Sequence, residues 1–335
     1  MHTSKRIILK TTAIIIFIGF GFNSFKTQVP GNTTVKAKYL GNYPSDRKTG
    51  WNEDLQGVAH DLNNWYFTQK IKIWKFPISR DLKKSISKNN LPTGIKSVTM
   101  LNRLRKRGYN HFGDLVQYKG YLFIPVEAEK GTNTKNPLLV VYKASTLTYI
   151  GAARLLHQTK AGWCAVNPEN GLLYSSNNHL TRENQLISYN IDFRALQSNK
   201  LDIQYQGIKK LYGEDGKLVK MKRYIQGGTF SSEGKFIFLL NGRESSATPA
   251  GKGGIWIFDT ESGKFIQKSA TSGYFRYEYH PGMPNLEEPE GLTYWELDKR
   301  NAPHIKGNLH AILLNNNIIG SDKFWLKHYQ IDFDK

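Results

Sequence analysis

The sequence predicts an all-β fold made of repeated units, and three observations support that prediction. A five-residue pattern that ends in an aromatic and then a polar residue recurs five times, with its aromatics 47 to 71 residues apart. Each copy follows another β-rich run, and each of those runs follows a segment that begins with glycine. No convincing amphipathic helix separates the copies. Three or four short strands per repeat in a constant order are typical of the blades of a β-propeller.

The repeats are defined by one aromatic and one glycine in each unit. The aromatics that end the pattern are Trp74, Tyr142, Tyr189, Phe258 and Tyr329. The glycines that begin the first strand of each unit are Gly57, Gly113, Gly162, Gly228 and Gly291. Turn residues separate the runs, and a fourth strand fits after the third. Five copies predict a propeller of five blades, with six blades as the alternative.

The last unit lacks room for its outer strand, because Lys335 ends the sequence six residues after Tyr329. The segment 33–41 precedes the first unit and has the composition of an isolated strand. We therefore expect residues 33–41 to pair with the strand near 324–331. This pairing would close the ring and remove the exposed edges that an open array leaves.

The composition fits one large domain. Of the 335 residues, 39% are hydrophobic and 13% are aromatic, which is enough for a sizeable core. The chain has a single cysteine, Cys164, so a disulfide scaffold is excluded. A free cysteine is most often buried, and we expect Cys164 to fill the core. Residues 25–335 are predicted to form a single propeller domain and to act as a monomer.

The N-terminus has the pattern of an export signal. Lys5 and Arg6 precede an almost unbroken apolar run from Thr11 to Phe22. This run has the length of a signal-peptide core and is short for crossing about 30 Å of hydrocarbon. We expect residues 1–24 to be a signal peptide, or an N-terminal membrane anchor if they are not cleaved. The predicted location is secreted, periplasmic or on the cell surface.

The charge is strongly positive and unevenly spread. The formal net charge is +20, and residues 70–107 contain twelve Lys or Arg beside the single acidic residue Asp81. Such a segment could bind a polyanion or an anionic surface from the rim of the ring, away from the axis. The alternative is a solvated outer strand and loop. The sequence has no motif for sequence-specific binding of nucleic acid.

The topology of a propeller indicates where a site would form. The first strand of every blade lines the axis, so residues near the five glycines converge although they are far apart in the sequence. The polar and aromatic members of this ring are Gln56, His111, Asp114, Trp163, Gln226, Glu288 and Glu290. They suit a polar small molecule, a glycan or a peptide. Carboxylate and amide oxygens also suit Ca²⁺, with Glu290 and Asp114 as the expected ligands.

Short stretches resemble known propeller families. The segments 228–238 and 254–264 resemble a blade of the NHL, YVTN and gluconolactonase-like proteins. Glu290-Gly291-Leu292 resembles the start of an inner strand in lactonase-like propellers, which implies that Glu290 is a calcium ligand. Leu55-Gln56-Gly57-Val58 and Glu290-Gly291-Leu292-Thr293 are similar to stretches of propeller-type glutaminyl cyclases.

Three functions remain open from the sequence. The first is an exported propeller that binds a polar ligand at the axis, with or without calcium. The second is an enzyme on the same scaffold, a lactonase-type hydrolase or a glutaminyl cyclase, with Glu288, Glu290 or His111 as acid or base. The third is a protein-interaction scaffold that uses the rim loops and the basic segment.

Overall fold

A computed structural model describes residues 34–87, 90–128, 136–242, 253–280, 287–295, 302–315 and 321–333. The chain divides into two units, residues 1–33 and residues 34–335, and all described residues belong to the second. The predicted signal segment 1–24 lies outside the described residues. Within the described ranges, no helix is long and apolar enough to cross a membrane.

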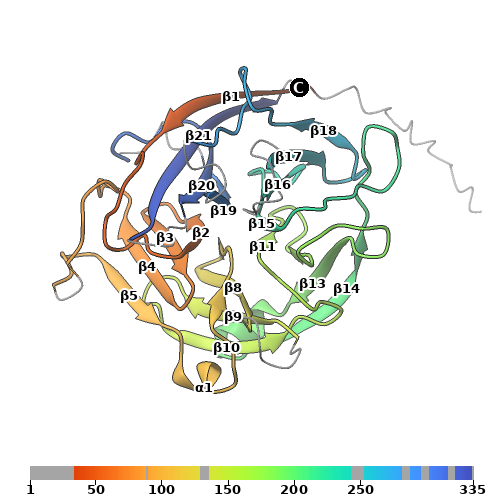
Figure 1. Ribbon diagram of the computed structural model, residues 1–335. Coiled ribbons are helices and arrows are strands. Elements are labelled where there is room, and N and C mark those ends of the chain that lie inside the picture. Colours follow the sequence, from red (N-terminus) through yellow and green to blue (C-terminus); the bar gives the residue numbers. More distant parts are fainter. Residues whose placement is uncertain are drawn as a thin grey trace, which may run out of the picture. The chain divides into compact units, whose positions relative to one another are not determined.

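Five antiparallel sheets surround a common axis in residues 34–335 (Figure 1). Blade 1 contains β2 (Leu55–His60), β3 (Asn64–Gln69), β4 (Lys72–Pro77) and β5 (Lys96–Thr99). Blade 2 contains β6 (His111–Phe112), β7 (Val116–Tyr118), β8 (Tyr121–Glu127), β9 (Leu138–Lys143) and β10 (Tyr149–Arg154). Blade 3 contains β11 (Cys164–Val166), β12 (Leu173–Ser175), β13 (Leu186–Ile191) and β14 (Ile203–Lys209).

The last two blades complete the ring. Blade 4 contains β15 (Ile225–Phe230), β16 (Phe236–Asn241), β17 (Gly254–Asp259) and β18 (Phe265–Lys268). Blade 5 contains β19 (Glu287–Tyr294), β20 (Leu309–Asn315), β21 (Lys323–Phe333) and β1 (Val35–Asn42). Two short helices, α1 (Asn102–Arg105) and α2 (Phe193–Gln197), lie between strands. The predictions of an all-β fold and of a five-bladed propeller are confirmed.

The ring is closed by the first described strand, as the sequence predicts. β1 pairs antiparallel with β21, so that Val35 lies opposite Phe333, Tyr39 opposite Tyr329 and Asn42 opposite Lys327. Figure 1 shows β1 along the outer edge of this blade beside β21. The blade is therefore built from both ends of the described chain.

The hydrophobic core lies between neighbouring blades. One cluster joins blades 5 and 1 through Trp65, Phe67 and Phe324, and four similar clusters fill the other interfaces. The five aromatics of the repeated pattern are each at most 2% exposed. Cys164 is also fully buried and free, as expected. The repeats are visible in the sequence because each blade needs the same large rings to fill its interface.

The repeated glycines are explained by close packing at the axis. A Cβ atom on Gly57 would lie 2.6 Å from Asp114 Cα, and one on Gly291 would lie 2.5 Å from Gly57 Cα. A Cβ on Gly228 would lie 2.2 Å from the ring of Trp163. A ring of only five blades brings the inner strands so close that side chains do not fit at these positions.

Candidate functional site

Asp114 ties the inner strands together at the axis. The inner strand of blade 2 is interrupted between β6 and β7, and Asp114 lies in this interruption. Its Oδ1 and Oδ2 accept four backbone hydrogen bonds of 3.0 to 3.2 Å, from the N–H groups of Val58, Leu115, Gly228 and Leu292. Its own N–H donates to the carbonyl oxygen of Gly162 at 2.8 Å. One residue therefore contacts all five blades.

This arrangement gives Asp114 a structural role in place of the predicted role as a metal or ligand contact. Its side chain is fully buried, and four N–H groups occupy the four lone-pair positions of the carboxylate. Burial raises the pKa of Asp114, and the four N–H groups oppose that shift. Trp163 is also fully buried, and its Nε1 donates to Ser176 Oγ at 2.9 Å. Its ring packs in a core cluster and is not exposed to a ligand at the axis.

Four of the five remaining predicted site residues form two hydrogen-bonded pairs where the inner strands begin; the fifth, Glu288, lies two residues before Glu290 on β19. We call this end of the axis the upper mouth. Gln226 Nε2 donates to Glu290 Oε1 at 3.0 Å. His111 Nε2 lies 2.6 Å from Gln56 Oε1, while Gln56 Nε2 donates to a backbone oxygen. Because that amide oxygen can only accept, His111 Nε2 carries the proton in this contact.

Glu290 has the most unusual electrostatic environment of these residues. It is 2% exposed, and burial raises its pKa well above the ordinary value. The negative charges of Glu288 and Asp114 raise it further, whereas the charge of Lys70 lowers it. The structure thus favours a protonated acid at the upper mouth, which can donate a hydrogen bond or a proton.

Lys70 belongs to the basic segment but lies near the axis. Its Nζ forms an ion pair with Asp54 at 2.9 Å, and its charge acts on Glu290. The expectation that the whole basic segment keeps away from the axis is therefore wrong for Lys70. The cause is its position between β3 and β4, at the end of the blade where the inner strand begins.

The sequence did not single out Glu127, which lies beside the upper mouth. Glu127 is directly opposite His111 in the pairing of β6 with β8. Its Oε2 forms an ion pair with Lys160 at 3.2 Å, and its Oε1 accepts from Ala161 N. Hairpin geometry is the signal that could have found it, because the second strand of a blade ends where the first begins.

The residues present do not fit the calcium site that the resemblance implies. Asp114 presents its oxygens to N–H groups, which are donors and cannot share those lone pairs with a cation. Within the described part of the chain, no three His, Cys, Asp or Glu side chains gather closely enough to hold a metal ion.

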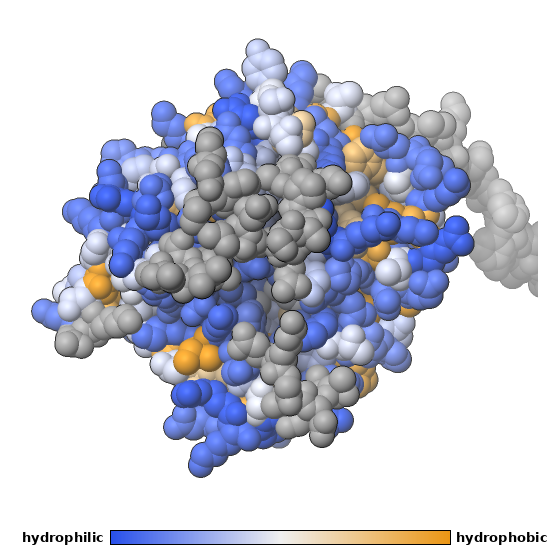
Figure 2. Space-filling view, viewed as in Figure 1, coloured by the Kyte–Doolittle hydropathy of each residue, from blue (hydrophilic) through white to orange (hydrophobic). Residues whose placement is uncertain are grey.

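Four other members of the basic segment lie over aromatic rings near blades 1 and 2: Lys72, Lys75, Arg103 and Arg107. Arg103 lies over Tyr149 at 4.7 Å, and Lys72 lies over Trp74 at 5.1 Å. Lys88 is outside the described residues. On the face shown in Figure 2, hydrophilic side chains cover much of the surface around the ring. Binding of a polyanion there stays a prediction, and its affinity should fall steeply with added salt.

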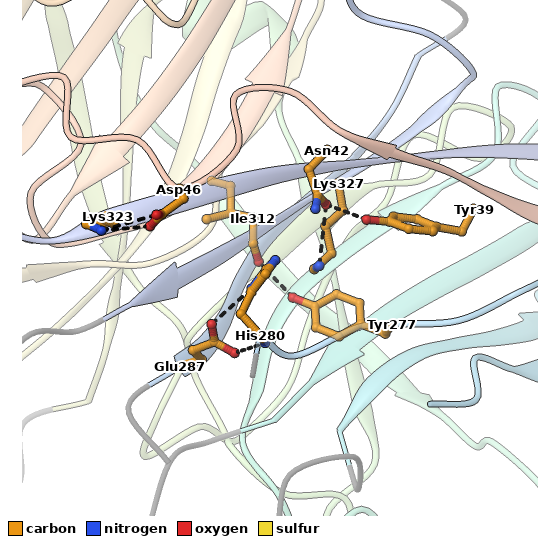
Figure 3. A network of polar contacts seen from close by, with 9 residues as sticks. All are labelled: Tyr39, Asn42, Asp46, Tyr277, His280, Glu287, Ile312, Lys323 and Lys327. Carbon is orange, nitrogen blue, oxygen red and sulfur yellow. Dashed lines mark hydrogen bonds and ion pairs between the residues drawn. The ribbon is translucent and has the colours of Figure 1, made fainter. Parts of the chain in front are cut away.

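A second polar network joins strands of blade 5 to Tyr277 and His280, which precede β19 in the chain (Figure 3). The ammonium group of Lys327 is fully buried, 5.2 Å from the ring centroid of Tyr277, and donates to Asn42 Oδ1 at 3.4 Å. His280 stacks on Trp325 with ring centroids 3.8 Å apart and lies 3.0 Å from Glu287. Burial lowers the pKa of Lys327 to about 7.

We expect the buried Lys327 to make stability depend on pH. The unfolded chain binds a proton at Lys327 up to pH 10.5, whereas the folded protein releases it near pH 7, so stability rises between these values. The charged groups that act on it are Glu278, Glu287 and Arg276. The rise between pH 7 and 10.5 is at most about 5 kcal/mol, because one pKa unit corresponds to about 1.4 kcal/mol.

The test is urea unfolding of Lys327→Met and of wild type from pH 6.5 to 10. The difference between the two free energies of unfolding should shrink or reverse as the pH rises. Lys323→Met is the matched control, because Lys323 lies on the same strand but is exposed and paired with Asp46 at 3.0 Å. If the free energies of unfolding of wild type and Lys327→Met change in parallel with pH, the prediction of a buried ammonium group with a lowered pKa is contradicted.

The chain is similar in fold to several solved structures. A thermostable family-43 glycoside hydrolase is 12% identical, with 86% of this chain and 92% of that chain covered and a TM-score of 0.50. Regucalcin, a calcium-binding protein from Agrobacterium tumefaciens, is 12% identical, with 81% and 74% covered and a TM-score of 0.42. The tail fibre of Staphylococcus aureus phage P68 is 17% identical, with a TM-score of 0.44.

The phage alignment covers 88% of this chain, which spans about half (52%) of the tail-fibre chain. No protein-family model and no curated protein matches the sequence. At 12% identity the similarity to the glycoside hydrolase is a similarity of fold alone.

Proposed function

We propose that this protein binds a polar ligand at the upper mouth of its axis. The observation that carries the proposal is the convergence of Gln56, His111, Gln226 and Glu290 from four blades on one end of the ring. Burying Glu290 costs stability, because the acid is removed from water and lies near other negative charges. A group that destabilises the fold in this way is characteristic of a functional site.

The chemistry of the mouth favours a ligand that donates hydrogen bonds. Glu288 and Glu290 lie together, and Asp54 also acts on Glu290. Gln56 is engaged through both atoms of its amide and Gln226 through Nε2, and each amide has further donor and acceptor positions. Of the ligands predicted from the sequence, a peptide or a small molecule with N–H groups fits this set better than a glycan.

An enzyme is the second candidate, and one observation favours it. The pKa of Glu290 is raised by burial and by the charge of a second carboxyl group, Glu288, and a carboxyl group with a raised pKa is suited to act as a general acid. Under this proposal Glu290 donates a proton to a leaving group and Glu288 or His111 accepts one from water. Hydrolysis of lactone and glycoside panels by wild type, and its loss in Glu290→Gln, would support it.

Replacing Glu290 with Gln tests the binding proposal. Glutamine keeps the acceptor for Gln226 but cannot ionise, so ligand-induced thermal shifts should disappear while the fold is kept. The variant should also be more stable than wild type at neutral pH. The reason is that a raised pKa makes wild-type stability fall as the pH rises above the ordinary range of glutamate.

The measurement is differential scanning fluorimetry at pH 5 to 8 with peptides, amines, sugars and calcium chloride. Glu233→Gln is the matched control, because Glu233 is exposed in a blade turn and pairs with Lys235 at 3.3 Å. A ligand shift that persists in Glu290→Gln contradicts binding at the upper mouth. No shift from any compound, together with unchanged stability of the variant, would favour the interaction-scaffold alternative.

We also propose that the protein is exported. The support is the basic and then apolar pattern of residues 1–24. N-terminal sequencing of the protein recovered from fractionated cells is the test. A mature N-terminus near residue 25 is expected for a cleaved signal, and an intact N-terminus in the membrane fraction for an anchor.

A further inference from the structure

A hollow of about 640 Å³ lies where the inner strands end, at the other end of the axis from the upper mouth. We call it the lower hollow. Its lining includes a residue at or just after the end of the inner strand in every blade: His60, Tyr118, Pro168, Ser231 and Trp295. Residues 330–333 of β21 complete the wall.

The lower hollow is separate from the site proposed above. Along β15, Gln226 contacts Glu290 at the upper mouth, whereas Thr229 and Phe230 line the hollow. Between them, the N–H of Gly228 donates to the buried carboxyl group of Asp114 at 3.2 Å. Packed backbone and this carboxyl group occupy the axis, so a ligand in the hollow would not contact the upper mouth.

The polar lining of the hollow is almost entirely uncharged. None of the lining residues is Lys or Arg, although the chain has 47 of them. Asp332 is the carboxylate of the lining, and it accepts from Gln330 Nε2 at 2.8 Å. His60 is the one ionisable base, and the hydroxyl and amide side chains of the lining are Gln117, Tyr118, Thr229, Ser231, Ser232, Thr293, Tyr294, Asn308 and Gln330. Burial lowers the pKa of His60 to about 4, so it too is neutral at pH 7.

Several of these groups have hydrogen-bonding capacity to spare. Within the described part of the chain, the side chains of Gln117, Thr229 and Thr293 form no hydrogen bond to the protein. An apolar ligand would bury them unsatisfied, which costs free energy. An anionic ligand would find no cation in the lining. A neutral ligand with many hydroxyl groups can both donate to and accept from these side chains.

Aromatic rings give the hollow rigid apolar surface. Trp295 stacks on His60 with centroids 4.1 Å apart and an interplanar angle of 7°. Phe333 stacks on Phe236 at 4.3 Å and 2°. A wall of fixed rings between hydroxyls and amides is complementary to a molecule that alternates C–H faces with hydroxyl groups.

We propose that the lower hollow binds a short neutral oligosaccharide. Its volume falls in the range of about 300–1,000 Å³ that small-molecule sites occupy. The proposal adds a second site and does not depend on the function proposed for the upper mouth. It names sugars without charged groups, because the hollow offers hydroxyls, amides and rings but no cation.

The experiment is isothermal titration calorimetry, with saturation-transfer NMR, of the full domain with maltose, cellobiose, lactose and N,N′-diacetylchitobiose. The double variant Thr229→Val Thr293→Val keeps the side-chain volume and removes two hydroxyls that have no partner in the described protein. We expect the dissociation constant of the bound sugar to rise about tenfold or more, because two hydrogen bonds to the ligand are lost.

Two controls keep this result specific. Thr271→Val removes an exposed hydroxyl outside the hollow and should leave binding unchanged. Glu290→Gln should also leave it unchanged, which separates this site from the upper mouth. The proposal is overturned if none of the four sugars binds, or if a uronic-acid disaccharide binds more tightly than all of them. It is also overturned if binding survives in the double variant but is lost in Glu290→Gln.

Discussion

Replacing Asp114 with Asn should lower the free energy of unfolding by about 2–6 kcal/mol, because each buried backbone donor that loses its acceptor costs about 1–3 kcal/mol. The amide NH₂ group of asparagine would face N–H groups that now donate to a carboxylate oxygen. Two of the four backbone donors would then lose their acceptor. Because a domain is stable by only about 5–15 kcal/mol, this loss threatens folding at 37 °C.

Hydrogen exchange distinguishes this role from a local defect. The amides of Val58, Gly228 and Leu292 lie in three different blades but share one acceptor residue. They should lose protection together in Asp114→Asn, at a denaturant concentration where the wild type is still protected. Asp215→Asn is the matched control, because Asp215 is exposed in a loop turn. A change in stability below about 0.5 kcal/mol would refute the central role of Asp114.

Deleting residues 25–42 should lower stability by several kcal/mol, a large part of the margin of a domain. The deletion removes β1, leaves β21 with an unpaired edge, and uncovers Tyr329, which packs against Tyr39 with ring centroids 5.4 Å apart. Thermal melting by circular dichroism measures the loss. Lys38→Ala is the control, because Lys38 lies on β1 with an exposed side chain.

Adding β1 back as a separate peptide tests the same pairing in the opposite direction. A synthetic peptide of residues 34–42 should bind the truncated domain and raise its melting temperature, because it can supply the same row of backbone hydrogen bonds. The same peptide with Tyr39 replaced by Asp should fail, since the ring at this position is buried. Unchanged melting of the truncated domain would show that β1 does not hold the ring closed.

The sequence predicts the architecture well because each blade repeats the same physical requirement. Tyr142 and Phe258 recur at one position since every blade interface needs a large ring. The segment 33–41 can be predicted as the closing strand because the last repeat has no room for a fourth strand of its own. These are local patterns whose meaning does not depend on distant residues.

The role of each single residue is harder to predict from the sequence, because it depends on which groups meet at the axis. The repeat pattern places Asp114 correctly at the axis, but no sequence pattern identifies the four backbone N–H groups that donate to its carboxyl group. Glu290 and Gln226 do meet, because both follow from ring symmetry. The lower hollow was missed because its walls come from strand ends and from β21.

The pairing of β1 with β21 sets an order of events during synthesis. Val35 leaves the ribosome among the first residues of the domain, and its partner Phe333 leaves about 300 residues later. At about 5–20 residues per second, the first strand waits roughly 15–60 s for its partner. During that time its backbone has no permanent neighbour, and alternating lysines at positions 36 and 38 keep it soluble and discourage pairing with another chain.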